Sequence, residues 1–352
     1  MMPYLPARFS TMRWRAGGVA AARMVLLIRK GPLGKAGSMI SITEVRQAAQ
    51  RIAPYVRTTP LVRLEALDDY LGCQVYVKLE NMQVTGSFKF RGAMNAALQL
   101  SEEQLACGLV AASSGNHGKA LSYAAKMLGT KATIVVPDTA AKVKVDAIAA
   151  LGATVVRCSV EERFQEAARI ATETGGTLVP PYDDERIMAG QGTIGMEISQ
   201  QLPSADVVVT PVSGGGLLGG VSTAVKALMP NTRVYGAEPA ARPRWTESLK
   251  AGQRVTVKSN PTNADALVTL TPGQACFPVV QQRVDAVVAV EEDALLAASK
   301  TLLTEGKVLA EFSSAIGIAA VREGLIPVSP ESKVCFVISG GSIGFDQIAL
   351  LA

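Results

Sequence analysis

A lysine in the stretch QVTGSFKFRGA, residues 83–93, could form a Schiff base with a carbonyl compound. The stretch follows an alternating apolar segment, residues 75–79, which predicts a half-buried strand. It leads into residues 88–100, where apolar side chains recur at helical spacing and Ser87 is a suitable N-cap. Lys89 is therefore expected in the first turn of a helix, where the helix dipole and partial burial both disfavour its ammonium form. Judged on these residues alone, a solvated surface lysine is the competing interpretation.

A glycine-rich segment, SGGGLLGG at residues 213–220, follows an apolar strand and opens a predicted helix. Clustered glycines allow backbone N–H groups to converge on a phosphate, and the helix dipole adds to the attraction. The glycines at 214, 216 and 219 also have the GxGxxG spacing. Glu238 lies 19 residues after Gly219, where a dinucleotide-binding fold places the acid that binds ribose. An NAD-dependent oxidoreductase is therefore an alternative interpretation, whereas the absence of a following Lys-Ser or Lys-Thr pair excludes a Walker A loop.

Two further loops follow predicted strands. SSGNHG, residues 113–118, combines hydroxyl and amide side chains with several backbone N–H groups, and such donors suit a carboxylate. An ordinary N-cap at Asn116 and a packed or surface histidine at His117 are the alternatives. SGGSIG, residues 339–344, ends the last predicted strand, so Ser339 is expected at the carboxyl edge of a sheet, where open α/β folds bind ligands.

Strand-like and helix-like segments alternate from Met39 onward, which predicts an α/β fold with parallel sheets wrapped by helices. One series of strands is predicted at 109–112, 132–137, 154–158 and 177–179, and a second at 206–210, 233–237, 286–290 and 333–338. We expect a small domain, residues 107–184, inserted into a large domain built from residues 39–106 and 185–352. The active site is expected in the cleft between the two domains.

The composition excludes several classes of protein. The 352 residues are 48% hydrophobic and 18% charged, which is enough to build large cores. Residues 1–38 contain seven basic residues and no acidic ones. Because the net charge of the whole chain is only +5, the rest of the chain is mildly acidic. We therefore expect no nucleic-acid partner. No apolar run reaches the roughly 18 residues of a membrane helix. We expect a disordered leader, residues 1–38, on a cytoplasmic protein, with organellar targeting by this leader as the alternative.

Cysteine and histidine usage limits the possible chemistry. The five cysteines are scattered, odd in number and without a CxxC pair, as expected for reduced thiols in a cytosolic compartment. His117 is the only histidine in the chain, which excludes a multi-histidine metal site. A Ser-His-Asp triad would also have to use this one residue.

Taken together, the motifs resemble the fold type II (tryptophan synthase β-like) family of pyridoxal-phosphate enzymes, in its serine/threonine dehydratase and serine racemase branch. The resemblance runs from about Thr43 to the C-terminus. It is carried by SFKFRGA at 87–93, SSGNHGKA at 113–120, AGQGT at 189–193, SGGGLLGG at 213–220 and SGGS at 339–342. It implies two open, twisted, mostly parallel sheets wrapped by helices, pyridoxal phosphate as the cofactor, a small amino acid as the substrate, and a homodimer.

The resemblance also implies a role for each matching residue. Lys89 would bind the cofactor covalently and move protons at the substrate Cα. The other cofactor-binding residues would be Phe88 beside the ring, Asn116 at the phenolic oxygen, Gly214, Gly215, Gly216 and Leu217 at the phosphate, and Ser339 at the pyridine nitrogen. The substrate carboxylate would be bound by Ser113, Ser114, Gly115, Asn116 and His117. Ser114 would be a second catalytic residue, on the face opposite the lysine.

The implied reaction is β-elimination from a 3-hydroxy amino acid such as L-threonine or L-serine, giving a 2-oxo acid and ammonia. Serine racemase and threo-3-hydroxyaspartate ammonia-lyase are the alternatives within the family. Glu238 matches the first ligand of a divalent-cation site of this branch, but Arg244 stands where a second acid is expected, so no metal is expected and Glu238 is only a candidate ligand. Ala266 and residues 311–315 also depart from the family pattern beside the expected pocket, which could change the choice of substrate.

Overall fold

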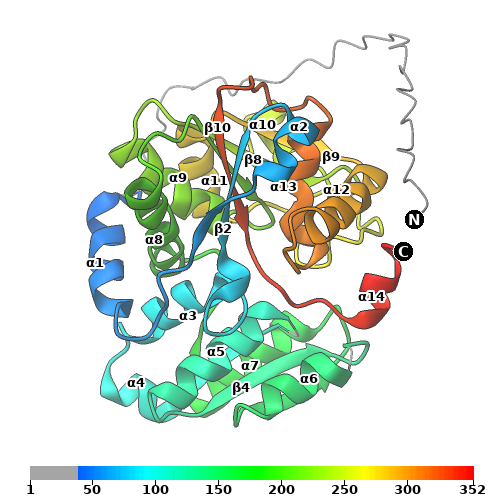
Figure 1. The fold of residues 1–352 in the computed structure, drawn as a ribbon. Helices are drawn as coiled ribbons and strands as arrows, with labels where there is room; N and C mark the ends of the chain where they lie inside the picture. Colours follow the sequence, from blue (N-terminus) through cyan, green and yellow to red (C-terminus); the bar gives the residue numbers. More distant parts are fainter. Residues whose placement is uncertain (1–38, 114, 141) are drawn as a thin grey trace, which may run out of the picture.

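The computed structural model describes residues 39–352 with the exception of residues 114 and 141, and it contains two sheets with helices packed around them (Figure 1). The predictions for residues 1–38 and for Ser114 lie outside the described residues. None of the helices in these ranges is long and apolar enough to cross a bilayer.

A six-stranded sheet forms the centre of the larger half of the molecule (Figure 1). Its strands lie in the order β1-β2-β10-β7-β8-β9, and all neighbours are parallel except β1 and β2. Strands β7 and β10 are nearly continuous apolar runs because helices cover both faces of the sheet. The bounds are β1 Leu61–Arg63, β2 Gln74–Leu79, β7 Val207–Pro211, β8 Arg233–Pro239, β9 Ala286–Val290 and β10 Lys333–Ile338.

Two apolar cores lie on the two faces of this sheet. Helices α8, α9 and α11 contribute to one core, and helices α2, α12 and α13 contribute to the other. Figure 1 shows these two groups of helices on opposite sides of the strands. The helices associated with the large sheet are α1 Ile42–Ile52, α2 Asp68–Leu71, α8 Glu185–Gln201, α9 Gly216–Leu228, α10 Arg244–Ala251, α11 Cys276–Arg283, α12 Glu292–Thr304, α13 Phe312–Arg322 and α14 Phe345–Ala349.

A four-stranded parallel sheet forms the smaller half, with the strand order β5-β4-β3-β6. Its strands are β3 Leu109–Ala112, β4 Ala132–Pro137, β5 Thr154–Cys158 and β6 Thr177–Leu178. The helices around it are α3 Lys89–Ala97, α4 Glu102–Cys107, α5 Asn116–Met127, α6 Lys142–Ala149 and α7 Arg163–Thr174. Phe90 and Met94 of α3 are fully buried in the same core as β3 and α5. Helix α3 therefore packs on the small sheet although it precedes residue 107.

The predicted α/β fold with two mostly parallel sheets is confirmed, and five of the predicted strands (109–112, 132–137, 154–158, 286–290 and 333–338) have the predicted bounds. The predicted cap of the lysine-bearing helix is wrong. Helix α3 begins at Lys89 without a side-chain cap, and the Ser87 hydroxyl is buried without a hydrogen-bond partner in the described part of the chain. The backbone of Ser87 instead forms a bridge with Gly340, so pairing with the last strand's loop fixes the start of the helix.

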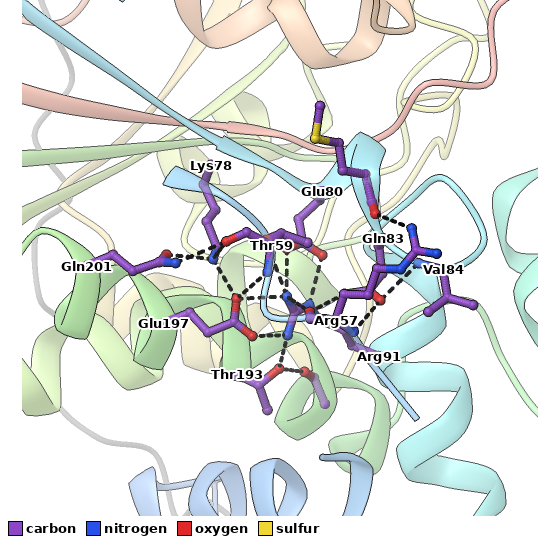
Figure 2. A network of polar contacts seen from close by, with 12 residues as sticks. Arg57, Thr59, Lys78, Glu80, Gln83, Val84, Arg91, Thr193, Glu197 and Gln201 are labelled. Atoms are coloured by element: carbon purple, nitrogen blue, oxygen red, sulfur yellow. Dashed lines mark hydrogen bonds and ion pairs between the residues drawn. The ribbon is translucent and has the colours of Figure 1, made fainter. Parts of the chain in front are cut away.

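A buried network of charges holds α3 against the large sheet (Figure 2). The Arg91 guanidinium donates from Nη2 to Oε1 of Glu80 at 2.8 Å and from Nη1 to Oε1 of Glu197 at 2.5 Å. Lys78 on β2 donates from Nζ to Oε2 of Glu197 at 2.5 Å. The side chains of Arg91, Glu80 and Lys78 are 0% exposed, so each charge depends on its protein partners for stabilisation. Because Arg91 is two residues after Lys89, this network also fixes the first turn of α3.

We predict that Arg91→Met lowers the free energy of unfolding by about 3–5 kcal/mol, because it leaves the buried Glu80 carboxylate without its cation. The matched control is Arg169→Met, which removes an arginine that forms ion pairs on the surface of α7. This control should leave the unfolding midpoint unchanged, since exposed pairs contribute little. The measurement is urea unfolding of the full chain, followed by tryptophan fluorescence and circular dichroism. Equal midpoints for the two variants would contradict the structural role of the network.

Candidate active site

A cavity of about 390 Å³ lies where the two halves of the molecule meet. It is lined by the start of α3 and by the loops that follow β3, β7 and β10. These loops leave the carboxyl ends of parallel strands, where α/β folds bind their ligands. The cavity brings together Lys89, Ser113, Asn116, Gly214 and Ser339, which are far apart in the sequence.

Lys89 is half-buried at the first position of α3 and lines the cavity. Its Nζ donates to the carbonyl oxygen of Pro181 at 2.7 Å and lies 5.0 Å from the centre of the Phe88 ring. No carboxylate in the described residues forms an ion pair with it. Burial lowers the pKa of the Lys89 amine from 10.5 to about 8. A substantial fraction of the amine is then neutral near physiological pH, as a nucleophile or a base requires.

The glycine loop after β7 presents backbone donors to the cavity. In the described part of the chain, the N–H groups of residues 214–217 have no hydrogen-bond acceptor, and residues 214–217 line the cavity. Gly215 has a φ of 111°, which side chains rarely permit, and it caps α9. A Cβ on Gly214 would lie 2.2 Å from the ring of Tyr182, so glycine is also required by close packing. Free N–H groups at the start of a helix suit a phosphate.

The loop after β3 reaches across the cavity. The Asn116 amide donates from Nδ2 to Oε2 of Glu311 at 2.9 Å, and its Oδ1 accepts from the Ser342 hydroxyl at 2.5 Å. Ser113 Oγ accepts from the N–H of Gly115 at 3.3 Å, which tightens the turn before α5. Ser113, Gly115 and Asn116 thus line one cavity with Lys89. The structure adds nothing on Ser114, which is outside the described residues.

His117 is packed and uncharged. Its Nε2 lies 2.9 Å from the carbonyl oxygen of Val179, and its Nδ1 is buried without a partner in the described part of the chain. Burial lowers the pKa of the imidazole to about 3, so a cationic His117 is strongly disfavoured. Of the two alternatives for this side chain, the structure shows the packed histidine. Its predicted contact with a substrate carboxylate would have to come from the neutral ring or the backbone.

Ser339 is buried at the end of β10, and its Oγ lies 3.1 Å from Oγ of Ser314. Ser314 also donates to the carbonyl of Gly340 and accepts from its N–H, each at 3.0 Å. The side chain that faces this part of the cavity is therefore a neutral hydroxyl in a network of neutral groups. The sequence did not indicate a role for Ser314, because its partner Ser339 is 25 residues away and the contact forms only when α13 packs on the loop after β10.

Two other residues of the cavity have no role in the sequence analysis. Glu311 is 2% exposed, and burial raises the pKa of its carboxyl group to about 7. The ring of Tyr182 packs against Gly214 beneath the glycine loop. Glu311 lies in the segment 311–315, which departs from the family pattern. This departure was the feature of the sequence that could have indicated a role for Glu311. Tyr182 follows two prolines and carries no local signal.

Glu238 does not line the cavity, which argues against both functions that the sequence allowed for it. Its carboxylate accepts from the N–H groups of Trp245 at 2.9 Å and Thr246 at 2.7 Å, and Nε of Arg244 lies 3.8 Å away. The carboxylate therefore caps α10 and is not free to bind a ribose. No group of three or more possible metal ligands occurs in the residues that the structure describes.

The fit of a phosphorylated cofactor can be tested on these observations. The free N–H groups of residues 214–217 can hold a phosphate, and the Lys89 amine can bind a carbonyl carbon in the same cavity. Phe88, Asn116 and Ser339 supply an apolar ring, an amide and a hydroxyl around the remaining space. Fold and site together define an enzyme that uses a phosphorylated aldehyde cofactor, bound through a Schiff base.

The chain belongs to the family of pyridoxal-phosphate dependent enzymes, whose family model matches residues 52–340. Its cofactor is therefore pyridoxal phosphate. An L-threonine ammonia-lyase of Thermotoga maritima is 40% identical over 312 residues, which are 88% of this chain and 77% of that protein. An L-threo-3-hydroxyaspartate ammonia-lyase of Saccharomyces cerevisiae is 37% identical over 313 residues, covering 88% of this chain and 95% of that protein.

Among solved structures, maize serine racemase is similar to this chain with a TM-score of 0.85 and 36% sequence identity. The similarity covers 89% of this chain and 96% of the maize chain. The resemblance to fold type II enzymes of the dehydratase and racemase branch is thus confirmed. The names of these three relatives cover three reactions, so identity of this order does not decide among them.

We predict that the rate of pyridoxal-phosphate uptake rises between about pH 7 and pH 9, with a midpoint near the Lys89 pKa of about 8. The sign follows from the chemistry, since only the neutral amine attacks an aldehyde and the neutral fraction grows as the pH rises through the pKa. The measurement is the growth of the visible absorption band of the protein-bound cofactor at each pH.

Lys89→Ala should abolish this band, and Lys131→Ala, which removes an exposed lysine, should leave the pH profile unchanged. A rate that keeps rising toward the ordinary lysine pKa of 10.5 would contradict the lowered value.

Proposed function

We propose that this enzyme deaminates a 3-hydroxy amino acid such as L-threonine or L-serine by β-elimination and releases a 2-oxo acid and ammonia. The observation that carries the proposal is the Lys89 amine of lowered pKa, which shares one cavity with the free N–H groups of the glycine loop and with the loop after β3. The similarity to ammonia-lyases over most of the chain supports it.

The residues of the cavity would hold the cofactor in one orientation. The N–H groups of Gly214, Gly215, Gly216 and Leu217 would bind its phosphate, and Phe88 would lie beside its ring. Asn116 would donate to the phenolic oxygen, and Ser339 would face the ring nitrogen. When bound, pyridoxal phosphate withdraws electrons from the amino-acid Cα and so makes the Cα proton acidic.

The protein supplies the remaining steps. Ser113 and the N–H groups at the start of α5 bind the substrate carboxylate, which fixes the Cα proton on the side of Lys89. The Lys89 amine accepts that proton, and the ammonium so formed supplies the proton with which the 3-hydroxyl leaves as water. One water is then consumed when the nitrogen is released as ammonia. In the net reaction, the 3-hydroxy amino acid becomes a 2-oxo acid and an ammonium ion.

The neutral partner of the ring nitrogen favours this outcome. The hydroxyl of Ser339 and its neighbour Ser314 offer no carboxylate to hold a proton on that nitrogen. A weaker electron sink favours loss of a leaving group over transamination. The same groups are compatible with racemisation, for which Ser114 would be the second proton carrier. Serine racemase is therefore the second candidate, supported by the similarity to the maize enzyme.

The proposal also extends to the assembly and organisation of the chain. We propose a homodimer that works in the cytoplasm, and we retain the division into residues 107–184 and the two flanking parts of a large domain. The strands of the small sheet support this division, because they all lie between residues 107 and 184, whereas helix α3 packs on that sheet from outside this range. Sedimentation equilibrium of the full chain would test the dimer.

The reaction is tested by incubating the full chain and pyridoxal phosphate separately with L-threonine, L-serine and DL-threo-3-hydroxyaspartate. We expect 2-oxo acid and ammonia in equal amounts, and the substrate with the highest kcat/KM identifies the specificity. Lys89→Ala should lower the rate by at least about 10²–10⁴-fold, because the base that accepts the Cα proton is lost. Lys131→Ala is the control and should retain full activity.

Formation of D-serine from L-serine without 2-oxo acid would replace the lyase by the racemase. Cofactor binding without either product would overturn both assignments of the reaction.

A further inference from the structure

An arginine is buried directly behind the glycine loop. Arg244 is the first residue of α10, and its side chain is 0% exposed. Its Nη2 donates to the carbonyl of Val212, its Nε to the carbonyl of Ser213 at 3.3 Å, and its Nη1 to the carbonyl of Arg242 at 2.8 Å. Two of these carbonyls are the last before the phosphate-binding glycines. Burial lowers the pKa of the guanidinium to about 10, so it stays charged at neutral pH.

The neighbouring tryptophan adds a second donor at the same point. Trp245 donates from Nε1 to the carbonyl of Ser213 at 2.6 Å. Its ring stacks on Phe277 with centroids 6.0 Å apart, and a Cβ on Gly215 would lie 2.4 Å from Cζ2 of the indole. Arg244 and Trp245 therefore both donate to the Ser213 carbonyl oxygen and hold the glycine loop on the side of α10.

The two hydrogen bonds to the Ser213 carbonyl also orient an N–H group of the proposed phosphate site, through the geometry of one peptide. The peptide between Ser213 and Gly214 is planar and trans, so its N–H points opposite to its carbonyl. Because two donors fix the Ser213 carbonyl on the side of α10, they also fix the direction of the Gly214 N–H, which is one of the free donors of the loop. A loop whose donors are already oriented binds its ligand without a further ordering cost.

The charge of Arg244 is balanced within the protein. Glu238 lies 3.8 Å away and is itself 0% exposed. Both of its oxygens accept hydrogen bonds, Oε2 from the N–H of Trp245 and Oε1 from the N–H and the hydroxyl of Thr246, each of these two at 2.7 Å. The carboxylate thus holds α10 in place and has its acceptor positions occupied. The residues beside the loop do not fit the divalent cation that the family branch implies, because the residue six positions after Glu238 is Arg244, a cation, and not a second acid.

We propose that Arg244 is a positioning residue for the cofactor phosphate, acting through the Ser213 carbonyl as a permanent internal cation that makes a bound metal ion unnecessary at this loop. This inference rests on the assignment of residues 214–217 as the phosphate site and is independent of which reaction the enzyme catalyses.

The test compares pyridoxal phosphate with pyridoxal, which forms the same bond to Lys89 but lacks the phosphate. The full chain is titrated with each ligand, and the dissociation constants are obtained from the visible absorption of the bound form. We expect Arg244→Met to weaken binding of pyridoxal phosphate by about tenfold or more, as loss of a buried charged donor implies, and to leave the affinity for pyridoxal unchanged. The ³¹P chemical shift of the bound phosphate should change as well.

Arg283→Met is the matched control. Arg283 also donates to a backbone carbonyl, that of Ile40 at 2.8 Å, and to the hydroxyl of Thr223, but it does not touch the loop. Its loss should leave both dissociation constants unchanged. Trp245→Phe is the second variant in case Arg244→Met does not fold. It removes the donor to Ser213 and keeps a ring, so it should weaken pyridoxal phosphate alone, by a smaller factor.

Equal loss of affinity for both ligands in Arg244→Met and Trp245→Phe would show a general structural role and overturn the proposal, as would unchanged affinity for pyridoxal phosphate. The wild-type affinity should be the same in EDTA and in millimolar magnesium, and a tenfold difference would overturn the statement about the metal ion. If these binding results hold but no amino acid is converted, the proposed reaction fails and the role of Arg244 stands.

Discussion

The site depends on keeping one lysine amine poorly solvated and without an ionic partner. A charged ammonium loses its hydration when protein surrounds it, and only a nearby anion or hydrogen bonds can offset that cost. At Lys89 the direct partner is a single carbonyl oxygen, that of Pro181, and burial lowers the pKa to about 8. Glu311, an acid of the same cavity, is itself buried and has a pKa raised to about 7. Both the Lys89 amine and the Glu311 carboxyl therefore have pKa values near neutrality and can gain or lose a proton at physiological pH.

Arg91, two residues after Lys89, is charged and paired with carboxylates, in contrast to the Lys89 amine, which forms no ion pair with a described residue. Arg91 is fully paired with Glu80 and Glu197 in the interior, and Lys78 completes the set (Figure 2). These residues come from β2, the turn after it, α3 and α8, so the pairing ties the helix that carries Lys89 to the large sheet while its apolar face packs on the small sheet. The position of the amine is therefore set by both halves of the molecule. Rigid support of this kind is what a poorly solvated reactive group requires.

Sequence patterns predict the strands and glycine loops of this molecule, because these depend on residues that are close in the sequence. Strands with continuous apolar runs and loops rich in glycine were placed correctly, because burial of whole strands and the φ values of glycine are visible in the sequence. Helix α8 begins at Glu185 and continues through Gly190, although glycines disfavour an isolated helix. A Cβ on Gly190 would lie 2.7 Å from the carbonyl oxygen of Arg91, so close packing on α3 requires the glycine that the propensity argument penalises. Ser87, Tyr182 and Ser314 were misjudged or missed for a related reason, as their partners are distant in the sequence.

Asn116 shows how binding in this cavity is coupled to the contact between the two halves. Its amide extends from the small-sheet side and already uses its donor on Glu311 and its acceptor on Ser342, both from the large-sheet side. A ligand oxygen that accepts from the same N–H of Nδ2 competes with Glu311 for that donor. A buried carboxylate that loses a donor is costly to leave charged, but a carboxyl group whose pKa is near 7 can take up a proton at small cost. The raised pKa of Glu311 thus allows the amide to change partners without leaving an unpaired charge in the cleft.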